Sequence, residues 1–438
     1  MIASIVRPRV ATPSFIALML ITGTTALSTD TYIAALPAVQ RTLGTSSSVA
    51  QLTMTACIGG MAIGQLGTGP VSDARGRRSL IVLATVVFAA TSVLCAVAFS
   101  GWQLIAARLV QGIAVGAAAA VGRAVVTDTW EGREAAARFG SLSAIGLIAP
   151  VIGPAIGGVL LTLGSWRIIF WFLALVGVAM TVAAVAGLPE TLPESRRHPG
   201  GLRRLFSRAG QLAADPAFAA PVLVQCLTVG GFFIYIGGSS FVLQQGLGIS
   251  ESLYTVVFAV NATVMMLASV AFRLLVMRLG PVVLRRWAIV IQTSAVTALF
   301  AVAMIYPHHR PPLTPVWICL GGMTFALGAY LPANSSITQA AGRRYAGTAS
   351  ALGGGVPFLA GSCTTPLTGL IGTQSVATMA TGMFAFFALA AVTAVITGRR
   401  RAPASAGPVG EVAPLHLDVV GEVPGVVPDT PDEARSAP

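Results

Sequence analysis

Two long apolar segments of this chain are separated by the ten residues Gly69-Pro70-Val71-Ser72-Asp73-Ala74-Arg75-Gly76-Arg77-Arg78. Glycine and proline allow two membrane helices to reverse direction within a few residues. We therefore expect a short basic turn between two spans, with Arg77 and Arg78 holding it at the cytoplasmic surface. Asp73 would face a helix N-terminus or an arginine. Taken alone, these residues also fit a turn that does nothing but set membrane topology.

The composition is that of a membrane protein. Hydrophobic residues make up 55% of the 438 residues and charged residues 10%, where a soluble protein carries roughly a quarter. A bilayer span needs about 20 mostly apolar residues, and such segments are too long for membrane β-strands. The sequence predicts an all-α membrane protein with twelve transmembrane helices in two six-helix repeats. The expected spans are residues 14–36, 49–69, 79–99, 103–127, 139–161, 167–188, 219–242, 251–277, 287–306, 315–338, 346–371 and 377–397.

The formal net charge of +12 comes wholly from arginine, because the chain has no lysine. The arginines cluster in alternate loops, which is the positive-inside pattern. We therefore expect a multi-pass protein of the plasma membrane with both termini in the cytoplasm, and no nucleic-acid partner. The cytoplasmic clusters are Arg7 and Arg9; Arg75, Arg77 and Arg78; Arg133 and Arg138; Arg196 to Arg208; Arg278, Arg285 and Arg286; Arg343 and Arg344; and Arg399 to Arg401.

The order of loops predicts two related halves. Arg278-Leu279-Gly280 followed by Arg285-Arg286 is a weaker copy of the opening turn, without its acid. A duplicated layout of this kind is typical of transporters that work about a central site. The segment that joins the halves is rich in proline and arginine, with a surface helix expected around residues 202–213. The expected parts are a cytoplasmic N-terminus (1–13), a first bundle (14–188), a cytoplasmic linker (189–218), a second bundle (219–397) and a disordered acidic tail (398–438).

Several further motifs follow in order. They are Thr29-Asp30-Thr31-Tyr32, Arg108-Leu109-Val110-Gln111-Gly112, Gly146 with Gly153-Pro154-Ala155-Ile156-Gly157-Gly158, and Leu188-Pro189-Glu190-Thr191-Leu192. Together with the opening turn, they make residues 14–397 resemble the major facilitator superfamily, and within it the Bcr/CflA drug-resistance branch. The resemblance implies a monomeric drug:proton antiporter whose partners are a small-molecule drug, protons and the lipid bilayer.

Asp30 and Arg108 are the candidates for proton coupling. A charged side chain inside a span is costly, so each is a functional candidate by default. Apolar surroundings disfavour an ionised carboxylate, which would let Asp30 gain and lose a proton. Arg108 would stabilise ionised Asp30 or an anionic substrate group, or else extend toward the membrane surface.

Three further sets of residues are candidates for gating and binding. The resemblance implies an inner gate, and glycines in span five that act as a hinge and a seal, with plain helix packing as the alternative. Aromatic and amide side chains would form an apolar wall with sparse hydrogen-bonding groups, or the aromatic side chains would simply face lipid or pack. The inner-gate set is Asp73, Arg77, Asp128 and Arg123; the span-five set is Gly146, Gly153, Pro154, Gly157 and Gly158; the substrate set is Tyr32, Phe232, Phe233, Tyr235, Asn261 and Asn334.

The sequence contains no nucleotide-binding loop, catalytic triad or metal-ligand cluster. We expect neither an enzyme nor a cofactor or metal. The energy for transport would come from an ion gradient, or transport would be passive. The predicted function is export of small, mostly apolar drugs or antibiotics in exchange for protons. An importer or facilitator of a small metabolite on the same fold is the nearest alternative, and a non-transporting membrane receptor is a further one.

Overall fold

The computed structural model describes residues 12–130, 134, 138, 141, 142, 152–194, 197, 202–306, 310–370 and 374–399. Every regular element within those residues is helical. The elements are α1 Phe15–Asp30, η1 Ile33–Ala35, α2 Leu36–Leu43, α3 Ser47–Arg75, α4 Arg77–Ala96, α5 Gly101–Thr129, α7 Arg167–Gly187, α8 Leu202–Ala214, α9 Pro216–Phe241, η3 Val242–Gly246, α10 Glu251–Ile305, α11 Leu313–Ala341, η4 Arg343–Tyr345, α12 Ala346–Thr364, α13 Leu367–Leu370 and α14 Val376–Arg399.

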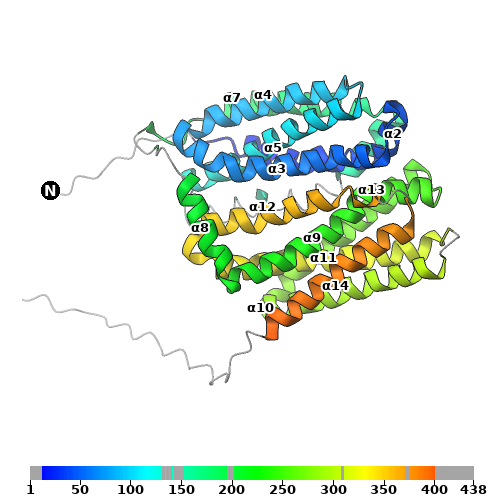
Figure 1. The fold of residues 1–438 in the computed structure, drawn as a ribbon. Coiled ribbons are helices and arrows are strands. Elements are labelled where there is room, and N and C mark those ends of the chain that lie inside the picture. The colour runs from blue at the N-terminus through cyan, green and yellow to red at the C-terminus, as the bar shows by residue number, and fades with distance from the viewer. Residues whose placement is uncertain are drawn as a thin grey trace, which may run out of the picture. The chain divides into compact units, whose positions relative to one another are not determined.

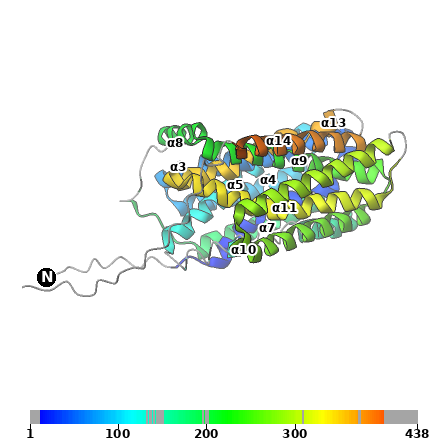
Figure 2. The same ribbon diagram turned by 90° about the horizontal axis from the view of Figure 1, so that it is seen from below.

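The long helices form two groups, one from each half of the chain. Helices α3, α4, α5 and α7 lie together in blue to green, and α9, α10, α11 and α14 lie together in green to orange (Figure 1). Helix α12 packs against both α3 and α9, so it joins the two groups. The view from below shows α10 and α11 side by side (Figure 2). A surface helix expected near residues 202–213 is present as α8.

Serine side chains begin several of these helices. Each accepts a hydrogen bond from a backbone N–H of the first turn, which satisfies one of the donors that a helix start leaves open. The pairs are Ser14 with Ala17, Ser46 with Val49, Ser100 with Gln103, and Ser250 with Leu253.

Helix α1 ends earlier than the predicted span. It stops at Asp30, and the chain continues through η1 into α2 rather than as one helix to residue 36. Consecutive Ser and Thr hydroxyls compete for backbone carbonyls here, as Thr31 does by donating to the Leu27 carbonyl oxygen over 2.8 Å. The last turn of α1, which carries the Asp30 carboxylate, therefore ends the helix inside the protein.

The turn between α3 and α4 is tighter than predicted. Helix α3 continues to Arg75, and Gly76 alone makes the reversal with φ 97° and ψ 160°. Gly280 has nearly the same conformation, φ 73° and ψ 157°, and divides α10 into helices 251–279 and 281–305. A side chain is strained at such a positive φ, which is why both positions need glycine.

The two halves also repeat a close helix contact. A Cβ atom on Gly116 of α5 would collide with the backbone oxygen of Met61 on α3. Gly328 of α11 stands in the same relation to the backbone oxygen of Met265 on α10. Met61 and Met265 are as far apart in sequence as Gly76 and Gly280, so the repeat extends from the turns into the packing.

Eight helices of the described residues are long and apolar enough to cross a membrane. The twelve predicted spans exceed that number for four reasons. Helix α10 holds two spans, α1 has 16 residues, span five is described mainly at the helix Ile152–Thr162, and α12 is not among the eight. The chain is an all-α membrane protein built from two helical repeats, as predicted.

Candidate functional site: a central cavity between the two halves

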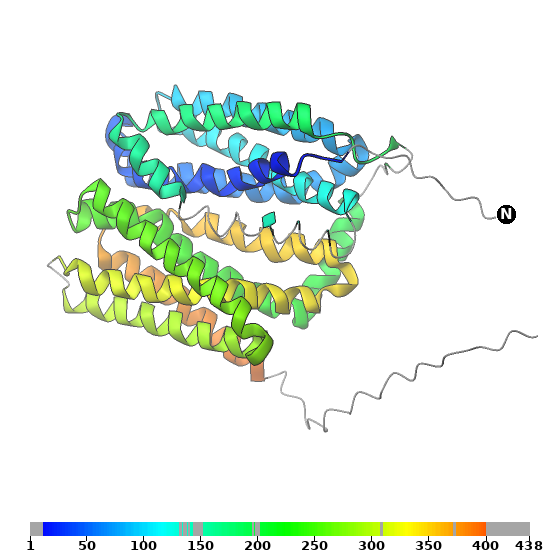
Figure 3. The same ribbon diagram turned by 180° about the vertical axis from the view of Figure 1, so that it is seen from behind.

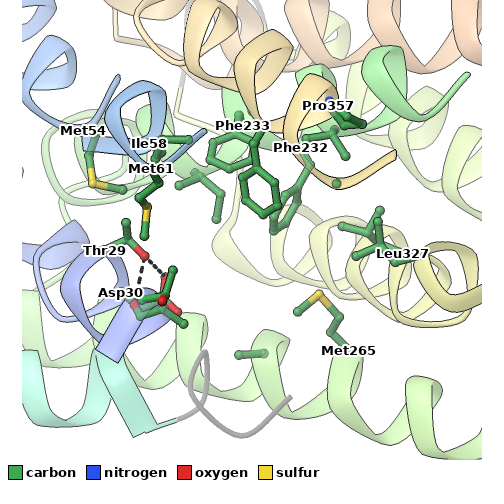
Figure 4. A pocket seen from close by; sticks show the side chains of 18 of the residues that line it. Thr29, Asp30, Met54, Ile58, Met61, Phe232, Phe233, Met265, Leu327 and Pro357 are labelled. Atoms are coloured by element: carbon green, nitrogen blue, oxygen red, sulfur yellow. Dashed lines mark hydrogen bonds between the residues drawn. The ribbon is translucent and has the colours of Figure 1, made fainter. Parts of the chain in front are cut away.

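A cavity of about 510 Å³ lies between the two halves. Helices α1, α3 and α5 line it from one half, and α9, α10, α11 and α12 from the other. In Figure 4, Thr29 and Asp30 lie on one side, with Phe232, Leu327 and Met265 on the other. Most of the lining side chains are apolar, and Asp30 is the one carboxylate among the described residues that line it.

The cavity is closed at the end where α2, η3 and α13 lie. Gln51 of α3 donates to the Thr368 hydroxyl oxygen and accepts from the Gly369 backbone N–H, both over 3.0 Å. Gln244 donates to the Ala34 carbonyl oxygen over 3.3 Å. These bonds join residues from opposite halves, so they hold the halves together at this end. We call it the closed end.

The opposite end, which holds Gly76 and α8, is here called the loop end. A second cavity of about 420 Å³ continues from the first and reaches the exposed side chain of Gln339. The two cavities share Gln65, Arg123, Gln225, Leu331 and Gly354. The central cavity therefore connects with the loop end, while hydrogen bonds between the two halves lie across the closed end.

Asp30 is at the C-terminal end of α1, and Thr29 donates to its Oδ1 over 3.1 Å. No ion pair to Asp30 is found within the described part of the chain. Asp30 therefore presents a carboxylate to a largely apolar cavity.

Arg108 is fully buried and does not contact Asp30. Its Nη1 donates to the Ser28 carbonyl oxygen over 3.1 Å and to Gln111 Oε1 over 2.6 Å. The guanidinium also lies 4.9 Å from the ring centre of Tyr32, a favourable cation–π position. Of the alternatives for Arg108, a direct bond to Asp30 is not made in this structure: Nη1 bonds to Ser28 and Gln111, and Nε has no hydrogen-bond partner among the described residues. Met54 lies between Arg108 and the cavity. Arg108 Nη2 is 4.0 Å from the Met54 sulfur, and Met54 lines the cavity.

The span-five glycines pack on the end of α1. A Cβ atom on Gly153 would lie 2.6 Å from the Asp30 Cβ atom, and one on Gly157 would collide with the Thr31 backbone oxygen. A Cβ atom on Gly158 would lie 2.7 Å from Cγ2 of Thr255, which belongs to α10. The helix Ile152–Thr162, which also holds Pro154, therefore touches both halves beside Asp30, while Gly146 is outside the described residues.

The predicted inner-gate residues separate into two places. Arg77 Nε donates to Asp128 Oδ2 over 2.9 Å, and the Thr191 hydroxyl is 3.4 Å from the same oxygen. These residues all belong to the first half, so the cluster fastens α4, α5 and the segment after α7 to one another. The side chain of Asp73 is outside the described residues. Arg123 does not join the cluster: its Nη2 donates to Gln65 Oε1 over 3.2 Å, and it lines both cavities.

The predicted substrate residues also divide. Phe232, Phe233, Tyr235 and Asn261 line the cavity. Asn261 accepts from Trp317 Nε1 over 3.0 Å and donates to the Tyr235 hydroxyl over 3.2 Å. Tyr32 and Asn334 are fully buried and line neither cavity. Their polar groups are used internally, Tyr32 with Thr53 and Asn334 with Arg285 and Gln225.

The sequence analysis assigned no role to Glu190. Its carboxylate accepts from the backbone N–H groups of Arg77 over 2.8 Å and Arg78 over 3.3 Å, so it caps the start of α4. A carboxylate stabilises a helix N-terminus through both hydrogen bonds and the helix dipole. In the sequence, Glu190 comes directly after an apolar span whose end is expected near the opening turn. That position could have indicated its contact with the start of α4.

Two helical repeats around a cavity that connects with one end define a polytopic membrane carrier. The sequence matches the Major Facilitator Superfamily over residues 18–366. It is 32% identical over 376 residues to an uncharacterised MFS-type transporter, YdgK, of Bacillus subtilis (strain 168), covering 83% of this chain and 92% of that one. The chain belongs to the Major Facilitator Superfamily and is a multi-pass membrane transporter.

Other relatives and solved structures agree with this assignment. The multidrug resistance protein MdtL of Klebsiella pneumoniae (strain 342) is 27% identical over 247 residues, which span 55% of this chain and 60% of MdtL. A bacterial homolog of the human lysosomal transporter Spinster, solved inward-facing and unoccupied, superposes with a TM-score of 0.65 at 17% identity over 88% of this chain and 95% of that one. A POT family transporter bound to 5-aminolevulinic acid gives 0.70 at 12% over 87% and 94%. At these identities the two structures establish the fold.

Proposed function

We propose that this protein is a Bcr/CflA-type exporter that exchanges protons for small, mostly apolar drugs. The observation that carries the proposal is Asp30, the one carboxylate among the described residues that line the largely apolar cavity. An apolar cavity of this size takes up drug-sized molecules, and a lone carboxylate in it couples their release to a proton. The multidrug resistance relatives support the substrate class.

The proposed cycle uses the two ends of the cavity in turn. With the loop end facing the cytoplasm of the cell, as its arginines favour, the present state loads drug from the inside of the plasma membrane. A proton from outside then binds Asp30 when the closed end opens. This proton leaves Asp30 when the protein returns to the present state. The hydrogen bonds of Gln51, Gln244 and their partners must break at each opening of that end.

The test begins with a susceptibility panel of apolar antimicrobials in a host that lacks its own efflux pumps. Compounds that the protein exports are then studied in proteoliposomes with a pH-sensitive dye inside. Antiport moves protons against drug, symport moves both in the same direction, and a receptor moves neither. Asp30→Asn should abolish proton-driven transport while drug exchange down its own gradient persists, and Asp30→Glu should keep part of the coupling. Full proton coupling in Asp30→Asn would refute the role of Asp30.

A further inference from the structure

Arg123 is a cation that faces the transport path. It lies on α5 at the junction of the two cavities, and its side chain is half-buried. Asp128, which the sequence analysis placed in the same inner-gate set, pairs with Arg77. Within the described part of the chain, Arg123 has no ion pair, and Gln65 Oε1 accepts one of its donors. An arginine keeps its charge in any protein environment and presents five N–H donors, so donors remain for a ligand.

Gln65 adds a second donor at the same place. Arginine can only donate, so the Gln65 oxygen must be the atom that faces Arg123. The Gln65 amide Nε2 is then directed elsewhere, and no hydrogen-bond partner for it is found among the described residues. Since Gln65 lines both cavities, this N–H₂ group is available to a ligand there.

Gln225, in the other half, adds a third donor, because two successive hydrogen bonds orient its side-chain amide. Arg285 donates to Asn334 Oδ1 over 3.2 Å, which leaves Asn334 Nδ2 as a donor. That Nδ2 donates to Gln225 Oε1 over 2.8 Å, so the Gln225 oxygen is occupied. The Gln225 Nε2 group has no partner within the described residues, and Gln225 also lines both cavities. An arginine in the second repeat thus fixes which end of a glutamine faces the transport path.

All three side chains present N–H donors, and those of Arg123 are charged. The side-chain oxygens of Gln65 and Gln225 already accept hydrogen bonds. A group that accepts hydrogen bonds and carries negative charge matches them, and a neutral or cationic donor group does not. We propose that Arg123, Gln65 and Gln225 form an anion-binding subsite, and that the preferred cargo is amphipathic, with an apolar body and one carboxylate, sulfonate or phosphate. This inference rests on the proposed function of the cavity as a drug site, and it names the class of drug.

The position of Asp30 is compatible with an anionic cargo. A Cβ atom on Gly122, the residue before Arg123, would lie 3.6 Å from the Thr22 hydroxyl oxygen on α1. Thr22 is eight residues before Asp30 on that helix, which is about 12 Å along a helix axis at about 1.5 Å per residue. A cargo with its anionic group at Arg123 therefore places its apolar body toward Phe232 and Phe233. The two negative charges stay apart, and the proton site remains free.

The test uses two dyes that differ in one group: 8-anilinonaphthalene-1-sulfonate and its uncharged parent, N-phenyl-1-naphthylamine. Each is titrated onto the full-length protein in phosphatidylcholine nanodiscs, with empty nanodiscs subtracted. The part of the tryptophan energy transfer that is lost in Trp317→Phe reports binding in the cavity, because Trp317 donates to the cavity residue Asn261, whereas Trp102, Trp171 and Trp287 are exposed. The variants are Arg123→Gln, which can still bond to Gln65, and Arg123→Lys, which keeps the charge but loses the planar fork.

Arg123→Gln should weaken binding of the sulfonate dye about ten-fold, the effect of losing a charged hydrogen bond. The affinity for the uncharged dye should stay within about two-fold, since its contacts are apolar. Arg123→Lys should give an intermediate affinity for the sulfonate dye, and Gln225→Leu a smaller loss than Arg123→Gln. An unchanged sulfonate affinity in Arg123→Gln, or an equal loss for both dyes, would overturn the subsite.

The same titration separates this inference from the proposed function. It is an equilibrium measurement, so a failure of proton coupling leaves its result intact. If both dyes bind wild-type protein equally and the variants change neither, the subsite is refuted while the cavity stands as a drug site. If neither dye shows energy transfer, the subsite and the cavity as an amphiphile site both fall.

Discussion

A Cβ atom on Gly153 would lie 2.6 Å from the Cβ atom of Asp30, so the span-five helix touches the turn that carries the candidate proton site. Gly157 contacts the next residue of that turn, and Gly158 faces Thr255 of the second half. In the view from behind, α1 lies in dark blue beside helices of its own half and faces the second half (Figure 3). Any movement of one half against the other therefore changes the packing at Asp30.

The first prediction concerns Gly157. Gly157→Leu should cripple drug–proton exchange, because its side chain meets the backbone of Thr31, which cannot rotate away as a side chain can. The displaced helix should also open a proton leak that needs no drug. The measurement is the decay of a pH gradient in vesicles, with and without drug, at matched protein levels.

Gly67→Leu is the matched control. Gly67 lies in α3, is exposed, and has open space at its Cβ position, so this variant should behave like the parent. If Gly157→Leu holds its gradient and exchanges drug at the parental rate, the span-five glycines are ordinary packing residues.

The sequence was sufficient for the architecture because the bilayer imposes it. Apolar segments of span length can satisfy their backbone groups in lipid as helices, and the arginines indicate which loops share a side. The reversal at Gly76 and its copy at Gly280 followed from the same pattern. The early end of α1 at Asp30 did not, because hydropathy cannot show where hydroxyl groups interrupt a helix inside an apolar span.

The site was predicted in its residue types more than in its contacts. Asp30, Phe232, Phe233, Tyr235 and Asn261 line the cavity. Pairings between helices were not accessible, since which of two acids meets an arginine depends on helix rotation. Arg123 and Asp128 are five residues apart on α5, so they point in different directions, one to the cavity and one to Arg77.

The second prediction concerns the Arg77–Asp128 pair. Asp128→Asn should destabilise the first half by about 1–3 kcal/mol, because it removes the charge of the carboxylate that accepts from Nε of the mostly buried Arg77. Transport should slow more than substrate binding weakens. Thermal unfolding in detergent and initial rates in vesicles check the two effects. Unchanged turnover and stability would show that this loop serves membrane topology alone.

The third prediction concerns the cap that Glu190 makes on α4. Glu190→Ala should cost about 1 kcal/mol of stability, since two backbone donors at the helix start lose their acceptor. Glu194→Ala is the control, because its carboxylate is largely exposed and pairs with Arg197 at 3.5 Å. Apparent melting temperatures of the two variants should differ, with only Glu190→Ala lowered. Equal values would mean that the cap contributes nothing measurable.

The last prediction concerns Asn261, which holds Tyr235 and Trp317 in place at the cavity wall. Asn261→Leu removes both bonds, so the Trp317 Nε1 donor loses its acceptor and the Tyr235 hydroxyl oxygen loses its donor, and drugs with polar groups should lose about ten-fold in affinity. Binding of N-phenyl-1-naphthylamine should change by less than about two-fold, because the apolar contact that its rings gain with the leucine side chain offsets the poorer fit to the cavity wall. Trp317→Phe is the comparison, since it breaks one bond and leaves the Asn261–Tyr235 bond intact. Equal effects of both variants on polar drugs would place the recognition at Trp317 rather than at the Tyr235 hydroxyl.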